Sequence, residues 1–215
     1  MSENLLHEQT GQSQRPTILK IFNENKKKVF FSIFTLIVIL ACLSLYIENN
    51  KQKKIKFSEN YLQAKISLEK GDKVQATSIL KQVVFENDPT YSSLSFFLII
   101  NEKLIEDKNE LTLMFNHLIK NNKFSSELTD LLIYKKALFS SNFMNETELL
   151  NLLNPLLIKE NLWHPQALIL LGDFFKSKNE NVKAREFYQK IFTLKNLHND
   201  FYDHAKHQLA LISND

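Results

Sequence analysis

The longest run of hydrophobic positions lies near the amino terminus, between Val29 and Ile47. Its nineteen residues, VFFSIFTLIVILACLSLYI, include no charged residue, no proline and no glycine. An α-helix rises about 1.5 Å per residue, so this run as a helix measures about 28 Å, close to the roughly 30 Å of hydrocarbon in a bilayer. The pattern predicts a transmembrane helix that places Val29, Phe34, Leu40 and Ile47 in the membrane.

Beyond residue 51 the hydrophobic positions recur every three or four residues. This period is typical of amphipathic α-helices that bury one face. Nine such series follow one another, and we expect the third to reach Ile105 and the sixth to be interrupted at Pro155. Turn-forming residues separate or open the series: Gly71-Asp72, Asn87-Asp88-Pro89, Asn121-Asn122, His164-Pro165 and Asn179.

The nine series predict four antiparallel helix pairs and a final helix from about Asn199 to Ile212. Asp203, Lys206 and Gln208 lie on the outer side of this final helix. Because each pair in a stack buries one face against the next, a helix with a polar outer side suits the end of the stack. Its inner side carries the hydrophobic residues Phe201, Tyr202, Ala205, Leu209 and Ile212.

The clearest repeating unit is residues 165–196, whose spacing matches the tetratricopeptide pattern. We expect Gly172 and Ala184 to allow close approach of the two helices, and Phe175 and Tyr188 to fill the space between them. An earlier unit repeats the second half of the pattern, and its Ala76 precedes Ala184 by 108 residues, close to three periods of about 34. The middle units match poorly, with Met114 and Leu118 as the nearest equivalents. The predicted packing residues are Ala76, Leu80, Leu171, Gly172, Phe175, Ala184 and Tyr188, with Leu168 and Ile191 beside them.

These patterns predict an all-α protein with a single amino-terminal transmembrane helix. A tetratricopeptide-like solenoid of about four helix pairs plus a capping helix follows it. We expect a flexible tail over residues 1–25, a membrane anchor over 26–50 and the helical domain over 51–215. The tail is polar and shows no hydrophobic period.

Composition narrows the class of protein further. Three glycines and four prolines in 215 residues disfavour a turn-rich β architecture. The net charge of +3 arises largely around the hydrophobic run, so no nucleic-acid partner is needed to explain it. The only cysteine, Cys42, lies inside that run, which leaves the helical domain without a disulfide or a thiolate metal site.

The hydrophobic run has two alternative interpretations. A cleaved signal peptide is disfavoured because the run is too long and no small-residue cleavage site follows it. A lipoprotein signal is the second alternative, because Ile39-Leu40-Ala41-Cys42 loosely matches a lipobox, although the residues after Cys42 remain hydrophobic. Basic residues flank the two ends of the hydrophobic run almost equally, so the charges do not decide the topology. The expected topology depends instead on the short tail before the run and the long domain after it. We expect the tail inside and the domain on the trans side.

The sequence offers no constellation typical of catalysis. It contains no phosphate-binding loop, nucleophile elbow or zinc-peptidase motif. His204 and His207 lie three residues apart, with Asp200 and Asp203 nearby, but we interpret them as surface residues rather than metal ligands. Trp163, the only tryptophan, is expected to fill the gap between neighbouring repeats. We therefore predict no enzyme, no cofactor, no metal and no small-molecule substrate.

A stack of helix pairs makes a concave surface from the first helix of each pair. In the best repeat we expect Gln166, Ile169, Asp173 and Lys176 to face this groove. Their mixture of apolar and charged side chains suits an extended or helical peptide.

The order of these parts resembles the YfgM-like ancillary subunit of the SecYEG translocon, a family with a divergent tetratricopeptide domain. The resemblance covers nearly the whole chain from Lys26. It implies a bacterial inner-membrane protein with a periplasmic domain that contacts translocon subunits and periplasmic chaperones, and it carries over no catalytic residue. Besides the anchor, the matching segments are Leu68-Glu69-Lys70-Gly71-Asp72, Gln75-Ala76, Asn161-Leu162-Trp163, Ala167-Leu168, Gly172 and Val182-Lys183-Ala184-Arg185.

Two functional hypotheses follow. In the first, the protein is a membrane-anchored interaction module that links chaperones to the Sec translocon. In the second, it is an anchored or lipidated scaffold for envelope assembly or cell division. Substitution of Cys42 discriminates between them, because only a lipidated scaffold would depend on this thiol.

Overall fold

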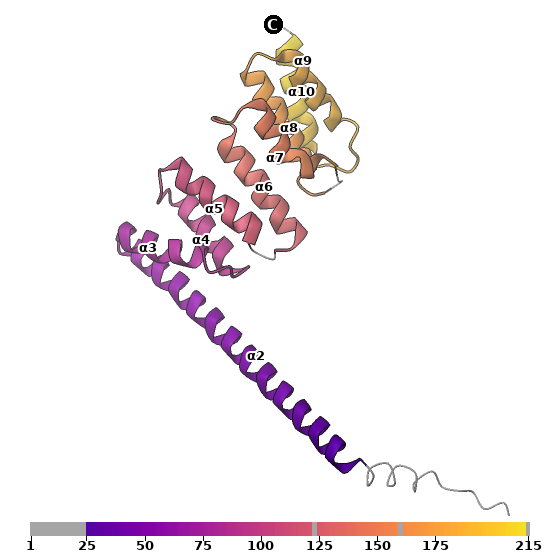
Figure 1. The fold of residues 1–215 in the computed structure, drawn as a ribbon. Coiled ribbons are helices and arrows are strands. Elements are labelled where there is room, and N and C mark those ends of the chain that lie inside the picture. The colour runs from indigo at the N-terminus through magenta and orange to yellow at the C-terminus, as the bar shows by residue number, and fades with distance from the viewer. Residues whose placement is uncertain (1–24, 122–123, 159–160, 214–215) are drawn as a thin grey trace, which may run out of the picture. The chain divides into compact units, whose positions relative to one another are not determined.

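The computed structural model describes residues 25–121, 124–158 and 161–213. Within these ranges the chain forms nine α-helices and no strand, which confirms the all-α class (Figure 1). The tail predicted for residues 1–25 lies outside the described residues except for Asn25. The helices are α2 (Lys26–Glu69), α3 (Lys73–Val84), α4 (Tyr91–Asn101), α5 (Lys108–Asn121), α6 (Ser126–Ser140), α7 (Glu146–Ile158), α8 (His164–Ser177), α9 (Asn181–Ile191) and α10 (Asn199–Ser213).

The chain divides into two compact units, the first ending at Lys56 and the second beginning at Phe57. The described part of the first unit is essentially the amino-terminal part of α2, a helix that is long and apolar enough to cross a membrane. Its large hydrophobic side chains are exposed, as Phe30 illustrates with an exposed fraction of 77%. The hydroxyl of Thr35 donates to the carbonyl oxygen of Phe31 at 2.8 Å, so this polar group is satisfied within the helix.

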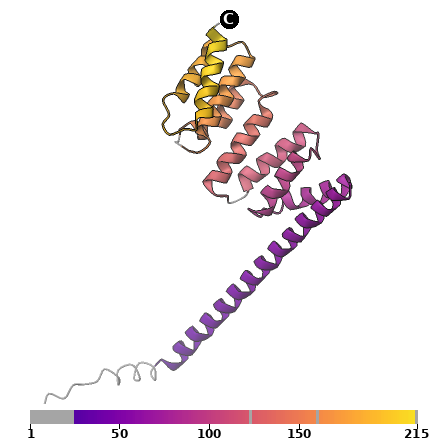
Figure 2. The same ribbon diagram turned by 180° about the vertical axis from the view of Figure 1, so that it is seen from behind.

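The second unit packs its helices around two clusters of buried side chains. One cluster is built from α2 to α6 and includes Phe96 and Phe115, whose rings lie 4.5 Å apart in an edge-to-face contact. The other is built from α6 to α10. Helix α6 contributes to both, because Leu132 belongs to the first cluster and Ile133 and Ala137 belong to the second. In both views α8, α9 and α10 lie side by side (Figure 1, Figure 2).

Local chemistry explains where several helices begin and end. Asp72 caps α3 by accepting a hydrogen bond from the Gln75 amide at 2.9 Å, after Gly71 has taken a positive φ of 81°. Asp88 accepts from the amides of Thr90 and Tyr91 ahead of α4.

Two predicted boundaries were wrong. Helix α4 ends at Asn101 rather than near Ile105, because Lys103 takes a left-handed φ of 50° and turns the chain out of the helix. Pro155 does not interrupt the sixth hydrophobic series, since α7 continues through it to Ile158. A proline within a helix removes one backbone hydrogen bond, and here the hydrophobic residues on either side, Leu153 and Leu156, are both fully buried.

The four helix pairs share one register of buried positions, which begins in the first helix of each pair at Ala64, Ile99, Ala137 and Gly172. Twelve residues later the second helix buries an apolar side chain, and further buried positions follow at intervals of four and three residues. The successive starting positions are 35, 38 and 35 residues apart. The second-helix positions are, in order, Ala76, Leu80 and Val83; Leu111, Phe115 and Leu118; Leu149, Leu153 and Leu156; and Ala184, Tyr188 and Ile191.

Candidate functional site

The four predicted groove residues lie on one side of α8, because they are spaced by three or four positions along it. Gln166, Ile169, Asp173 and Lys176 are all half-buried. Ile169 packs against the carboxy-terminal hydrophobic cluster. The side-chain oxygen of Gln166 is buried and has no hydrogen-bond partner. This side of α8 therefore combines an apolar contact with a buried acceptor that has no hydrogen-bond partner.

Helix α10 contacts the other end of this row. The Lys176 ammonium donates to the side-chain oxygen of Gln208 at 2.6 Å. Nε2 of His204 lies 3.2 Å from Oδ1 of Asp173. Asp173 and Lys176 therefore join α8 to α10, whereas Gln166 and Ile169 form the part of the row farther from these contacts.

Asp173 also links the two helices of its own pair. The Tyr188 hydroxyl donates to Oδ1 of Asp173 at 2.7 Å. Burial raises the pKa of the Tyr188 phenol, and the hydrogen bond to the Asp173 carboxylate and the charge of that group raise it further. The pKa of Tyr134 on α6 is also raised, mainly by burial and in part by the negative charge of Asp173. The Asp173 carboxylate thus influences side chains from three helices.

Gly172 provides the space that Tyr188 occupies. A Cβ atom placed on Gly172 would lie 2.7 Å from Cδ1 and 2.8 Å from Cζ of the Tyr188 ring, closer than van der Waals contact. Tyr188 is fully buried. The other aromatic residue of the repeat pattern, Phe175, stacks on Phe187 with the ring centroids 5.4 Å apart and the planes inclined by 5°. The spacing of residues 165–196 identified Phe175 but not its partner Phe187.

Trp163 connects the third helix pair to the fourth. Its ring stacks on Tyr134 of α6, with centroids 5.4 Å apart and planes inclined by 21°. The Trp163 amide donates to Asn161 Oδ1 at 2.8 Å, which fixes the turn before α8. The indole Nε1 is buried without a hydrogen-bond partner. Tyr134 was not identified from the sequence, because a single tyrosine on an amphipathic helix gives no indication of what it meets in space.

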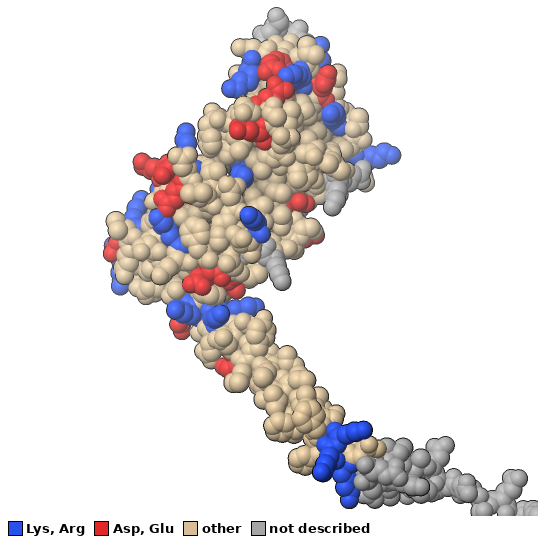
Figure 3. Space-filling model, viewed as in Figure 1, with Lys and Arg blue, Asp and Glu red and all other residues tan. Residues whose placement is uncertain are grey.

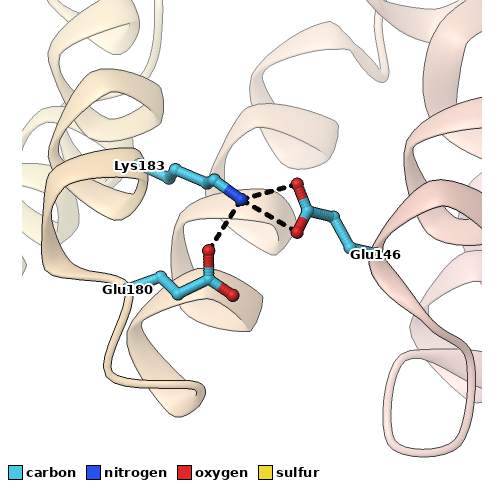
Figure 4. A network of polar contacts seen from close by, with 3 residues as sticks. All are labelled: Glu146, Glu180 and Lys183. Atoms are coloured by element: carbon cyan, nitrogen blue, oxygen red, sulfur yellow. Dashed lines mark hydrogen bonds and ion pairs between the residues drawn. The ribbon is translucent and has the colours of Figure 1, made fainter.

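A second contact between pairs is electrostatic. The Lys183 ammonium lies between two carboxylates, 2.8 Å and 2.9 Å from the oxygens of Glu146 and 2.7 Å from Glu180 (Figure 4). It thereby connects the start of α9 with the start of α7. Hydrogen bonding to Glu146, and then to Glu180, raises the pKa of Lys183. These side chains are about 40% exposed, so the network orients the helices more than it stabilises them.

The histidines and aspartates considered as metal ligands do not converge. His204 contacts Asp173, whereas Asp200, Asp203 and His207 are exposed. Among residues 25–121, 124–158 and 161–213 no group of three or more histidine, cysteine, aspartate or glutamate side chains is arranged to hold a metal ion.

A surface hollow of about 820 Å³ lies elsewhere in the second unit, along α3. Val74, Phe85 and Leu104 contribute apolar surface to it, and Lys73 and Lys81 contribute positive charge. Lys81 forms an ion pair with Glu110 of α5 at its edge. The hollow is a second surface with mixed chemistry, distinct from the row on α8.

No protein-family model matches the sequence, and comparison with curated proteins and with solved structures also gave no match.

Proposed function

We propose that this protein is a membrane-anchored, tetratricopeptide-like interaction module that binds other proteins. In this proposal residues 29–47 of α2 insert in the membrane and the second unit lies on the trans side. The observation that carries the proposal is the shared register of buried positions in the four helix pairs. A register of this kind, repeated about every 35 residues, is typical of helical repeats that stack pair on pair.

Small residues in the register support the tetratricopeptide-like reading. Three of the four starting positions are Ala64, Ala137 and Gly172, which let a neighbouring helix approach closely. The exception is Ile99, and there the second helix supplies Phe115, whose ring contacts Phe96. The second pair therefore fills the same space with larger side chains, which is why its sequence departs most from the pattern.

The row of half-buried residues on α8 supports a peptide-binding role. Ile169 offers apolar surface, and the Asp173 carboxylate, 44% exposed, offers an acceptor. The Trp163–Tyr134 stack joins the turn before α8 to helix α6. An extended or helical peptide presents apolar side chains and hydrogen-bond donors in alternation, which matches this combination. A membrane tether raises the effective concentration of such a module near partners in the same membrane, so weak contacts suffice.

The proposed setting is the Sec translocon of a bacterial inner membrane, where the protein acts as an ancillary component that links periplasmic chaperones to the channel. This part of the proposal depends on the resemblance of the chain to the YfgM-like family. It is an inference by analogy, and the partners are its testable content.

The test is purification of the full-length protein in mild detergent from its native membrane, followed by identification of the proteins that accompany it. We expect translocon subunits and periplasmic chaperones in near-stoichiometric amounts. The matched variants are Ile169→Glu, which places a charge in the α8 row, and Val182→Glu, which places the same charge at an exposed apolar position of α9. Loss of partners in the first variant alone supports the α8 row. Division or envelope-assembly proteins in place of the translocon would refute the proposed setting.

A further inference from the structure

The amino-terminal helix carries two clusters of lysines that the proposed interaction module does not use. Lys26, Lys27 and Lys28 form the first cluster, and the second consists of Lys51, Lys53, Lys54 and Lys56. All seven side chains are exposed and belong to the continuous helix α2. Figure 3 shows the lysines at the two ends of an uncharged stretch of this helix.

In the part of the chain that the structure describes, these lysines have no acidic partners. Between residues 26 and 56 the only acidic residue is Glu48, and it accepts a hydrogen bond from Gln52 at 2.7 Å. Within the described residues no ion pair joins any of the seven lysines to a carboxylate. Residues 26–56 therefore carry an excess of six positive charges, and no ion pair among the described residues neutralises them.

The spacing of the clusters matches the two headgroup layers of a bilayer. At about 1.5 Å per residue, the inner lysines Lys28 and Lys51 lie about 35 Å apart along the helix, and the outer ones, Lys26 and Lys56, about 45 Å apart. The hydrocarbon core of a bilayer is about 30 Å thick, and the bilayer with its headgroups is about 40–45 Å thick. Each cluster thus spans the depth at which lipid phosphates lie.

The lysines also surround the helix rather than marking one side. Successive residues of an α-helix are rotated by about 100°, so positions 51, 53, 54 and 56 point in four separate directions. The three consecutive lysines of the first cluster likewise point in three separate directions. Lipids on every side of the helix therefore meet at least one ammonium group.

We propose that the two lysine clusters select anionic phospholipids, so that the helix is surrounded by negatively charged headgroups in both leaflets. This inference depends on the membrane anchor of the proposed function but not on the translocon. Basic residues next to a membrane span attract anionic headgroups, and the attraction weakens with salt because the Debye length is about 10 Å at 0.1 M.

The experiment uses the full-length protein reconstituted in phosphatidylcholine vesicles that contain 20% phosphatidylglycerol. Electron paramagnetic resonance of spin-labelled lipids measures the fraction that the helix immobilises. We expect spin-labelled phosphatidylglycerol to be favoured over spin-labelled phosphatidylcholine by about threefold at low salt. The preference should fall at 0.5 M NaCl, at which the charges are screened.

Three sets of variants locate the effect. Changing Lys51, Lys53, Lys54 and Lys56 to Gln should remove about half of the preference, and changing all seven lysines should remove it entirely. The matched control changes four exposed lysines of the second unit to Gln: Lys70, Lys120, Lys135 and Lys206. This control has the same change in net charge as the four-lysine variant and should keep the full preference.

Two outcomes would overturn the inference, and they differ in their consequence for the anchor. Equal immobilisation of the two lipids by the unmodified protein would refute lipid selection and leave the anchor intact. Absence of any immobilised lipid would refute the anchor and the lipid selection together.

Discussion

At the residue scale, Gly172 is important for the side chain it lacks. The Tyr188 ring occupies the space where a Cβ would lie, and the hydroxyl of that ring reaches Asp173, the next residue of α8. The missing methyl group and the buried hydrogen bond therefore depend on the same placement of one aromatic ring. Each can be tested separately.

Gly172→Ala is expected to destabilise the protein by about 1–3 kcal/mol, the usual cost of forcing an extra methyl group into a packed core. The measurement is urea unfolding of the full-length protein in mild detergent, followed by circular dichroism. Gln189→Ala on the exposed side of α9 is the control and should change the free energy of unfolding by less than about 0.5 kcal/mol. Helix propensity alone favours alanine over glycine by about 1 kcal/mol, so a stabilised Gly172→Ala would contradict the close contact.

The burial of Tyr188, together with its hydrogen bond to Asp173, predicts a loss of stability at alkaline pH. The pKa of Tyr188 is raised in the folded protein above its ordinary value of 10.0. Below pH 10 the phenol is protonated in both states, and its contribution to stability is complete. Above pH 10 only the unfolded state releases the proton, so the free energy of unfolding decreases as the pH rises. Urea unfolding between pH 8 and pH 11 should show this decrease, and Tyr188→Phe should reduce it.

The control for this pH dependence is Tyr202→Phe. The Tyr202 hydroxyl donates to the carbonyl oxygen of Leu194 and has no carboxylate partner in its hydrogen bond. The alkaline decrease should persist in this variant. If Tyr188→Phe kept the same slope as the unmodified protein, the Tyr188 phenol would not be the cause.

At the scale of the helices, the sequence was most informative where packing is local. The period of the hydrophobic residues predicted nine helical series, and the last unit was recognised because Gly172 and Ala184 stand out within a short segment. The third pair was not recognised, although Ala137, Leu149 and Leu153 are all fully buried in the same register. Leucine is common in any amphipathic helix. The leucines of the register can therefore be told from the other leucines of the pair only by their burial in the structure. The contacts of Tyr134, Phe187 and His204 were missed because their partners come from other helices.

The register in the third pair predicts an overpacked core when Ala137 is enlarged. Ala137→Leu is expected to cost about 1–3 kcal/mol, because the residue is fully buried between α6 and α7. Lys135→Leu, two positions away and exposed, is the matched control and should be nearly neutral. Thermal unfolding followed by circular dichroism compares the two. Equal midpoints would show that Ala137 is not a close-packing position.

At the scale of the whole molecule, the two units have opposite surface chemistry. The first exposes Phe30, Phe31 and Leu45 with more than two thirds of each surface accessible, whereas the two clusters of buried side chains both lie in the second. Exposed hydrophobic residues on every side of a helix are unfavourable in water and favourable in lipid. The composition of nineteen residues was sufficient to predict this contrast, because a membrane span depends on length and polarity rather than on contacts.

A charge at the centre of the span should therefore impair membrane integration. Leu40→Arg is expected to cost about 2.5–3.5 kcal/mol for insertion and to increase the share of protein released by alkaline carbonate. Leu62→Arg, at an exposed position of the second unit, should remain in the membrane fraction. Release of both variants to the same extent would mean that the effect is not specific to the span.

Cys42→Ala distinguishes an uncleaved helix from a lipoprotein signal. If the anchor is an uncleaved helix, this substitution changes the mass only by the difference between cysteine and alanine and leaves the membrane association unchanged. Intact mass spectrometry of the purified protein is the measurement. A mature chain that begins at a lipid-modified Cys42, and an uncut precursor in the Cys42→Ala variant, would refute the uncleaved anchor.

The stacking of Trp163 on Tyr134 gives the molecule a built-in optical probe. Because Trp163 is the only tryptophan, its emission reports one place, the contact between the third and fourth helix pairs. Stacked helical repeats do not always unfold as one cooperative unit. If the tryptophan spectrum changes at a lower denaturant concentration than the helical signal, the last two pairs separate before the remaining helices melt. Comparison of the two titrations can thus reveal whether the helix pairs unfold together or one after another.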